Sequence, residues 1–483
     1  MIDIVTSPAT ALAAAIARRE VSSTELLDAY LQRIERYNGP LNIVVTLDVE
    51  RARARAREAD EATARGQSWG PLHGLPITVK DTFETAGIRT TAGFPPFADH
   101  VPDTDADIVE SVVQAGAIVF GKTNVPVLAG DWQSYNPVFG VTRNPWNPER
   151  TPGGSSGGSA ASIASGFSAF EIGSDIGGSI RVPSHWCGVF GHKPSLGIIP
   201  PRGHIPGPPG AKAEVDLGVM GPIARSAGDL ALLLDIMARP APLDAKAWKL
   251  ELPAPRHQRL SDYRIAACID DTDYPVDAEV RTVLAAAIEN LRKAGARIQE
   301  TTLPVRLREI CDVYQQLLWP ILLAGFPPET FAEMSKLAAS FPAGAGAPIA
   351  LMARYGTATH RDWLGANEVR EHLRYAFAEF FTRYDVLLTP VNQVSAIAHD
   401  HSDPFIARSI RINGETVPYA DMFGWIAPAT AALLPATAAP AGRTCAGMPV
   451  GLQIVGPYLE DRTTVDFARH VEQACGGFVP APL

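Results

Sequence analysis

Two loops rich in glycine and serine constrain most strongly what this chain of 483 residues can fold into. The first is Thr151–Ser159 (TPGGSSGGS) and the second is Gly173–Arg181 (GSDIGGSIR). Glycine lets the backbone approach a ligand closely and turns N–H groups towards it. The small and apolar residues between the loops predict a helix over 160–166 and a strand over 168–173. The loops are therefore expected to be held by regular structure, and not to form a flexible linker.

A serine hydroxyl becomes a nucleophile only beside a base that takes its proton. Ser155 and Ser179 are the candidate hydroxyls, and Lys80 is the candidate base because it ends an apolar run (LPITVK). A lysine acts as a base only when neutral, and burial lowers its pKa by disfavouring the charged form. Side chains alternate along a strand, so Asp81 is expected to point away from Lys80. From the residues alone, Ser156 fits the place of Ser155 equally well.

These motifs resemble the amidase signature family, which consists of serine hydrolases with a Ser–Ser–Lys triad. Lys80 stands in the family's Gly-x-Pro-x-x-x-Lys-Asp context, 75 residues before Ser155, and Ser179 follows 24 residues later. The similarity spans nearly the whole chain and leaves only 200–215 and 310–360 without a matching motif. The resemblance, and not the spacing alone, selects Ser155 over its neighbour.

The resemblance implies that Ser179 is the nucleophile, that Lys80 acts on it through Ser155, and that the peptide bond before Ser155 is cis. Asp175 and Arg181 are expected to hold the second loop by charge-assisted hydrogen bonds. Backbone N–H groups aimed at one point form an oxyanion hole. The donors expected here are those of Ile176, Gly177, Gly178 and Ser179.

The resemblance also implies a single α/β domain over 1–483, with a mixed, twisted central sheet covered by helices on both faces. Strands alternating with helices independently favour an α/β fold. Residues 7–66 are predicted to be helical, 70–230 to form the core with the catalytic loops, and 310–360 to form a variable substrate-pocket region. Asn38-Gly-Pro40 is expected to end the first long helix. Further strands are predicted at 77–79, 117–120, 265–269, 386–388 and 452–455, and helices at 107–115 and 277–294.

Composition excludes several classes of protein. A net charge of −10 and a pI near 5.6 argue against a nucleic-acid surface. No apolar run approaches the roughly 20 residues of a membrane span, and the N-terminus shows no signal-peptide pattern. The five cysteines form neither a disulfide framework nor a metal pattern. A cytoplasmic protein with reduced thiols is expected.

The implied reaction is hydrolysis of a carboxylic amide through an acyl-enzyme, with no cofactor and no metal. Esters and aryl carbamates have a similar carbonyl group. The expected partner is a small-molecule amide, and the expected state is a monomer or homodimer. Aromatic and proline residues in the segments without motifs favour an apolar, aryl substrate, although aromatic residues usually serve packing. The candidate pocket residues are Trp132, Ile205, Trp319 and Phe326. The proline-rich loop 200–210 is also predicted to lie near the site.

The main alternative is the glutamine-hydrolysing subunit of an amidotransferase complex, which has the same triad, works with a partner and has a polar pocket for glutamine. The aromatic residues of 319–341 and the segment 125–132 depart from that pattern, so an amidase acting by itself is preferred.

Two motif matches are weaker. Gly116–Thr123 fits the P-loop expression, but its variable positions predict a strand. Gly153–Gly157 fits the nucleophile elbow of α/β-hydrolases, which needs an acid and a histidine such as Asp385 with His399 or His401. Those histidines show no third ligand for a metal.

Overall fold

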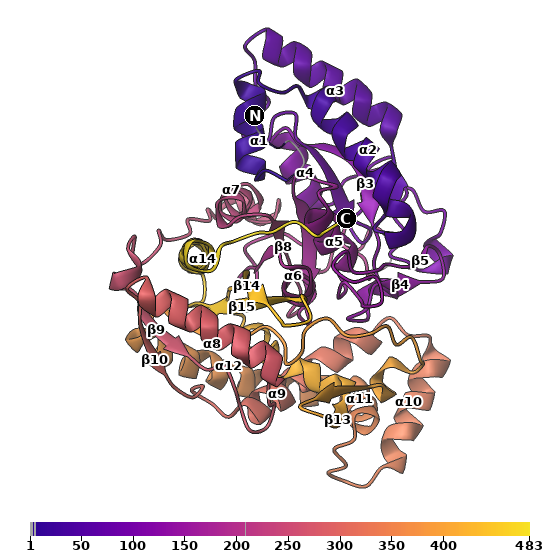
Figure 1. The fold of residues 1–483 in the computed structure, drawn as a ribbon. Coiled ribbons are helices and arrows are strands. Elements are labelled where there is room, and N and C mark those ends of the chain that lie inside the picture. Colours follow the sequence, from indigo (N-terminus) through magenta and orange to yellow (C-terminus); the bar gives the residue numbers. More distant parts are fainter. Residues whose placement is uncertain (1–2, 4–5, 208) are drawn as a thin grey trace.

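A computed structural model describes residues 3, 6–207 and 209–483 (Figure 1). Its centre is a sheet of eight strands: β6 (Glu171–Asp175), β7 (Phe190–Lys193), β8 (Val219–Ala224), β9 (Arg264–Ala267), β10 (Arg297–Glu300), β11 (Val386–Pro390), β14 (Ala436–Arg443) and β15 (Pro449–Val455). Their order across the sheet is β10-β9-β11-β15-β14-β7-β8-β6. The β10–β9 and β9–β11 pairs are parallel and all the others are antiparallel, so the sheet is mixed, as predicted.

Helices cover both faces of this sheet, and α6 and α14 lie on either side of β14 and β15 in Figure 1. The helices are α1 (Ala9–Ala17), α2 (Ser23–Leu41), α3 (Val49–Ala64), α4 (Asp107–Gln114), α5 (Gly157–Ser165), α6 (Arg181–Cys187), α7 (Ala227–Met237), α8 (Ala278–Lys293), α9 (Leu307–Leu323), α10 (Pro328–Ser340), α11 (Pro348–Gly356), α12 (His360–Arg383), α13 (Ala427–Ala431) and α14 (Asp461–Cys475). Within the described part of the chain, none is long and apolar enough to cross a membrane.

A second, three-stranded sheet carries the candidate base. It consists of β1 (Val44–Leu47), β2 (Pro76–Lys80) and β3 (Ile118–Thr123), with β3 in the middle. β3 pairs parallel to β2 and antiparallel to β1, and β2 packs against β6 of the central sheet. The prediction that 7–66 is wholly helical is wrong at β1, because four residues are too few to show a strand period. Two small hairpins, β4–β5 (Tyr135–Asn136, Gly140–Val141) and β12–β13 (Ser409–Ile412, Glu415–Pro418), complete the strands.

The ends of α2 show which local signals decide helix boundaries. It begins with a capping box, in which the Ser22 hydroxyl accepts from the Glu25 N–H and the Glu25 carboxylate accepts from the Ser22 N–H. The predicted stop at Asn38-Gly-Pro40 is early, because the helix continues to Leu41. The Asn38 side chain instead accepts hydrogen bonds from the N–H groups of Ile43 and Val44, which follow the end of the helix.

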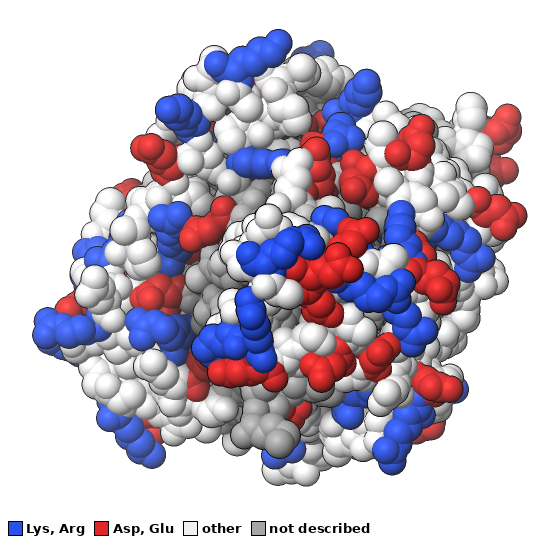
Figure 2. All heavy atoms as spheres, turned by 90° about the horizontal axis from the view of Figure 1, so that it is seen from above, with Lys and Arg blue, Asp and Glu red and all other residues white. Residues whose placement is uncertain are grey.

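The other predicted elements are confirmed. Strands β2, β3, β9, β11 and β15 and helices α4, α5 and α8 lie where the sequence indicates, and the strand after the first loop, β6, begins three residues late. Gly295, at φ +103°, follows α8 in a backbone conformation that glycine favours. On the face seen in Figure 2, acidic and basic side chains are interspersed and no continuous basic surface forms.

Candidate active site

Lys80 lies at the end of β2, fully buried, on the face of the strand that is turned towards β6. Its Nζ donates to three serine hydroxyls, Ser155 at 2.7 Å, Ser156 at 2.9 Å and Ser174 at 2.9 Å. Burial lowers the pKa of Lys80 to about 7, and the negative charge of Asp175 opposes that shift. A buried amine that is partly neutral near pH 7 can accept a proton from a hydroxyl.

The neighbouring Asp81 does not neutralise Lys80. Its carboxylate points to the other side of the strand and accepts from the backbone and the hydroxyl of Thr91. Burial raises the pKa of Asp81 to about 6, opposed by the charge of Lys122. Alternation along β2 therefore separates the two charges, as the sequence predicts.

The two Gly-Ser loops lie side by side. The N–H of Ser156 donates to the carbonyl oxygen of Ser179 at 3.1 Å, and the Gly154–Ser155 peptide bond is cis. A β-carbon at Gly154 would lie 2.4 Å from the Asp131 carbonyl oxygen, so only glycine fits there. The first loop is therefore packed against the backbone of residues 131–133, while its two serines contact Lys80 and the second loop.

Asp175 organises the second loop from within. Its carboxylate accepts from the N–H groups of Gly178 (2.9 Å) and Ile180 (3.0 Å). It also forms two bonds of 3.0 Å with the Arg181 guanidinium, and both side chains are fully buried. Burial disfavours ionisation of Asp175, but Arg181 outweighs it and holds the pKa of the carboxyl below its ordinary value. Arg181 also donates to Gln453 on β15, which ties the loop to the central sheet.

This arrangement corrects one predicted oxyanion donor. The N–H of Gly178 is occupied by Asp175 and is turned into the loop. Among the described residues, the N–H groups of Ile176, Gly177 and Ser179 have no acceptor. These three remain available to a negatively charged oxygen.

Two aromatic side chains orient the carbonyl groups of the same loop. The Tyr314 hydroxyl donates to the Ile176 carbonyl at 2.8 Å, and the Trp132 indole donates to the Gly177 carbonyl at 2.6 Å. In a planar trans peptide the N–H points opposite to the carbonyl, so each bond also sets the direction of the next N–H. Both rings belong to an aromatic cluster, which consists of Trp132, Tyr314, Trp319, Tyr419 and Phe423. Nothing in the sequence marks Tyr314, which is one of many buried residues at helical spacing in α9.

The four candidate pocket residues do not share one open surface. Trp132 touches the second loop, as described above. Trp319 is only 1% exposed and packs in the aromatic cluster, whereas Phe326 is 46% exposed in the turn after α9. Ile205 is buried and its N–H donates to the carbonyl of Thr82. Helical geometry explains the difference, because the side of α9 that carries Trp319 faces the core and the chain beyond the end of the helix faces solvent.

The proline-rich loop 200–210 is described except for residue 208, which falls outside the described residues. Through His204 the loop does reach the Lys80 cluster, because the Nε2 atom lies 2.8 Å from the Ser174 hydroxyl. The sequence prediction does not single out this histidine. Its only signal is its position in a Gly/Pro-rich segment without a family motif.

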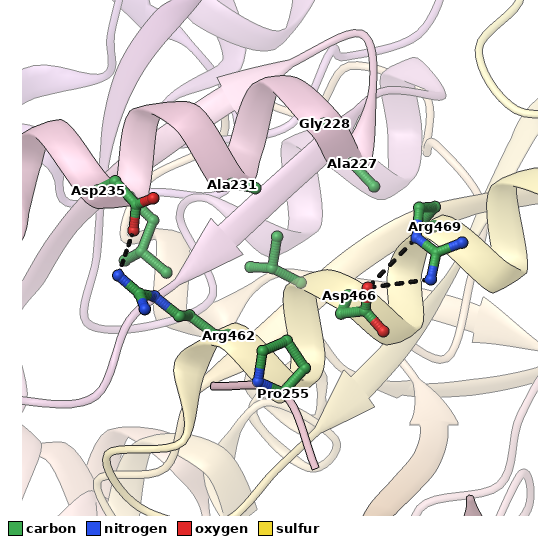
Figure 3. Close-up of a pocket in the computed structure, with 10 residues that line it drawn as sticks. Ala227, Gly228, Ala231, Asp235, Pro255, Arg462, Asp466 and Arg469 are labelled. Atoms are coloured by element: carbon green, nitrogen blue, oxygen red, sulfur yellow. Dashed lines mark hydrogen bonds and ion pairs between the residues drawn. The ribbon is translucent and has the colours of Figure 1, made fainter. Parts of the chain in front are cut away.

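Two surface cavities lie elsewhere, and neither is lined by a residue of the Gly-Ser loops. One, of about 150 Å³, lies between α7 and α14 (Figure 3). Its charged side chains are paired, Asp235 with Arg462 at 2.8 Å and Asp466 with Arg469 at 3.1 Å. The other, of about 530 Å³, is bordered by α1 and by residues 63–73. Paired charges of the kind seen in the first cavity offer no free acid, base or nucleophile.

The weaker motif interpretations find no support in the geometry. Residues 118–123 form strand β3, so the P-loop match is not a phosphate-cradling loop. Asp385 is held by Arg256 and Arg264, and His399 contacts the Pro148 carbonyl. No group of three or more His, Cys, Asp or Glu that could hold a metal occurs in the described ranges.

We expect the substitution Asp175→Asn to lower the free energy of unfolding by about 3–5 kcal/mol, because it leaves the Arg181 charge buried without a counter-charge. Urea unfolding followed by circular dichroism measures the change. Glu20→Gln is the matched control, since Glu20 pairs with Arg18 at the surface and its loss should leave the midpoint unchanged. Equal midpoints for the two variants would contradict the role given to Asp175.

Comparison with known proteins places this geometry in context. A family model described as Amidase matches residues 25–465. One of the similar proteins is a glutamyl-tRNA(Gln) amidotransferase subunit from Synechococcus sp. (strain CC9605). It is 34% identical over 490 residues, which cover 96% of this chain and 95% of that protein.

Two solved structures show the same architecture over their whole length. One, described as an amidase, is 29% identical, with a TM-score of 0.78, and the match covers 97% of this chain and 100% of the other. The second comes from a vestigial protein complex that reveals the evolutionary origins of an s-triazine catabolic enzyme. It is 26% identical, with a TM-score of 0.81 and coverage of 99% and 100%.

Proposed function

Because this chain belongs to the amidase signature family, we propose that it cleaves a carboxylic amide through an acyl-enzyme on Ser179. The observation that carries the proposal is the fully buried Lys80, which has a pKa of about 7 and lies 2.7 Å from the Ser155 hydroxyl. Burying a lysine without a direct carboxylate partner costs free energy of folding. Such burial is typical of a catalytic base, because it lowers the pKa of the amine.

In the proposed reaction Ser155 carries protons between Ser179 and Lys80. The Ser179 oxygen attacks the carbonyl carbon, its proton passes to Ser155, and the Ser155 proton passes to Nζ. The developing oxyanion accepts hydrogen bonds from the N–H groups of Ile176, Gly177 and Ser179. The C–N bond then breaks, and the proton returns through Ser155 to the leaving nitrogen. Water attacks the acyl-enzyme by the same route, releases the acid and restores the serine.

Ser155 suits the shuttle better than Ser156 does. Among the described residues, the Ser155 hydroxyl has Lys80 as its hydrogen-bond partner and is free on its other side. The Ser156 hydroxyl also contacts the backbone of Ser174, and its N–H is bound to the Ser179 carbonyl. Ser156 therefore supports the junction of the loops, and Ser155 is left to exchange protons.

The substrate has two candidates. The 34% identical relative, an amidotransferase subunit, favours glutamine as the substrate. It also favours a protein that works with a partner, whereas the sequence predicts a monomer or homodimer. The case for an aryl amide is weakened by the burial of Trp319, but one observation supports it. Beside Trp132, the charges of Asp131 and Arg408 pair with each other at 2.6 Å, and so neither is left for the α-amino or α-carboxylate group of glutamine.

We expect a fluorophosphonate probe to label Ser179, because the probe reacts with a serine that has a base and an oxyanion hole. Ser179→Ala should abolish both labelling and amide turnover. Mass-spectrometric mapping of the adduct identifies the residue, and an adduct on any other serine would disprove the assignment.

The pH dependence follows from Lys80. Protonated Lys80 cannot accept a proton, so the labelling rate should fall as the pH drops below about 7, in line with its lowered pKa. Lys80→Ala should slow labelling by about 10²–10⁴-fold, the usual contribution of a general base. The rate is measured from pH 5.5 to about 9 in both proteins. An unchanged profile in Lys80→Ala would exclude the lysine as the base.

Comparison of kcat/KM for glutamine, a short aliphatic amide and an anilide distinguishes the two substrate candidates. The paired charges beside Trp132 predict a preference for the anilide in the isolated chain, since burial of apolar surface then supplies the binding energy. A preference for glutamine, or co-purification of a second protein needed for turnover, would instead establish the amidotransferase function.

A further inference from the structure

The loop that carries His204 is fixed against the chain that leaves β2. The N–H of Glu84 donates to the Gly203 carbonyl at 2.9 Å, and the N–H of Ile205 donates to the Thr82 carbonyl at 2.7 Å. A β-carbon at Gly203, at φ +82°, would lie 2.6 Å from the backbone of Ala106. The backbone on both sides of the histidine is therefore held by residues that directly follow the base.

The imidazole of His204 contacts the base cluster through one hydroxyl. Its Nε2 lies 2.8 Å from the Ser174 oxygen, and the same oxygen accepts from Lys80 at 2.9 Å. The ring is partly buried and packs on Phe83, with 5.0 Å between the ring centroids. Burial, together with the charge of Lys80, lowers the pKa of His204 to about 3. The ring is therefore neutral near pH 7, where Lys80 loses its proton.

We propose that His204 is a positioning residue that, through Ser174, directs the lone pair of Lys80 towards Ser155. The proposal rests on the function proposed above, in which Lys80 takes the proton from Ser155. Nothing in the chemistry requires His204 to touch the substrate.

Counting hydrogens gives the reason. A neutral lysine amine has two N–H groups and one lone pair, and three serine hydroxyls surround it here. For the lone pair to face Ser155, both N–H groups must be donated to Ser156 and Ser174. The Ser174 hydroxyl then needs another acceptor for its own single hydrogen. The Nε2 of His204, 2.8 Å away, supplies it in the tautomer that carries the ring hydrogen on Nδ1. Without that acceptor, Ser174 is free to donate to Lys80 and to compete with Ser155 for the lone pair.

The test measures the rate at which the fluorophosphonate probe labels Ser179, which needs no knowledge of the substrate. His204→Phe keeps a ring against Phe83 but removes the acceptor, and labelling should slow at least about tenfold, a part of the 10²–10⁴-fold supplied by a general base. His204→Gln supplies an amide oxygen as acceptor and should restore most of the rate. His372→Phe, on the exposed face of α12, is the matched control and should label like the wild type.

A double-mutant cycle tests whether His204 acts through Ser174. Ser174→Ala alone should slow labelling, and adding His204→Phe should slow it no further, because coupled residues are not additive. Thermal unfolding of each variant normalises the rates to folded protein. Should His204→Phe not fold, His204→Leu takes its place.

Three results would overturn the proposal: wild-type labelling by folded His204→Phe, equal losses in the Phe and Gln variants, or additive effects in the cycle. Failure of the wild type itself to label at Ser179 would instead refute the proposed function, so the two failures are distinguishable.

Discussion

The burial of one lysine amine is the constraint on which the rest of the site depends. Among the described residues, Lys80 has no direct carboxylate partner, and three serine hydroxyls from two loops satisfy its hydrogen-bonding capacity. Two of these hydroxyls, Ser155 and Ser156, belong to the first loop, which lies so close to the backbone of residues 131–133 that only glycine fits at position 154. The first loop thus supplies two partners of the amine in a conformation that needs glycine at position 154. Neutral hydroxyl partners do not stabilise the charged form as a carboxylate would, so the pKa stays low.

A buried charge pair holds the second loop where the amine needs it. Asp175 satisfies the N–H of Gly178 and the guanidinium of Arg181, and Arg181 continues to Gln453 on the central sheet. The pair stands close enough to Lys80 for the Asp175 charge to raise the lysine pKa, yet burial outweighs it. Pairing with Arg181 compensates the carboxylate charge. The Asp175 carboxylate therefore orders the loop, while burial remains the main influence on the pKa of Lys80.

Local chemistry in the sequence predicts part of this site. Alternation along β2 separates Lys80 from Asp81, and the glycine–serine pattern brings Ser155 to the lysine. What the sequence does not predict depends on the packing of distant segments. The hydrogen bond of the Gly178 N–H depends on the orientation of the Asp175 carboxylate. The burial of Trp319 depends on which side of α9 faces the core. The sequence does not predict the strand β1, because its four residues show no period and the strand forms only by pairing with β3, which follows α3, β2 and α4 in the chain.

Segments distant in the chain contact the second Gly-Ser loop and the Lys80 cluster through single side chains. Tyr314 in α9 and Trp132 each bind a carbonyl of the loop that carries Ser179, and His204 contacts the hydroxyl beside Lys80. Because the peptide is planar, the bond from Tyr314 to the Ile176 carbonyl also sets the direction of the Gly177 N–H, so a shift of α9 would redirect this proposed oxyanion donor. Hydrogen bonds thus join α9, Trp132 and the loop of His204 to the residues of the proposed triad and their loops. In the proposed mechanism, a substrate bound against α9 would then adjust the Gly177 N–H that stabilises its transition state.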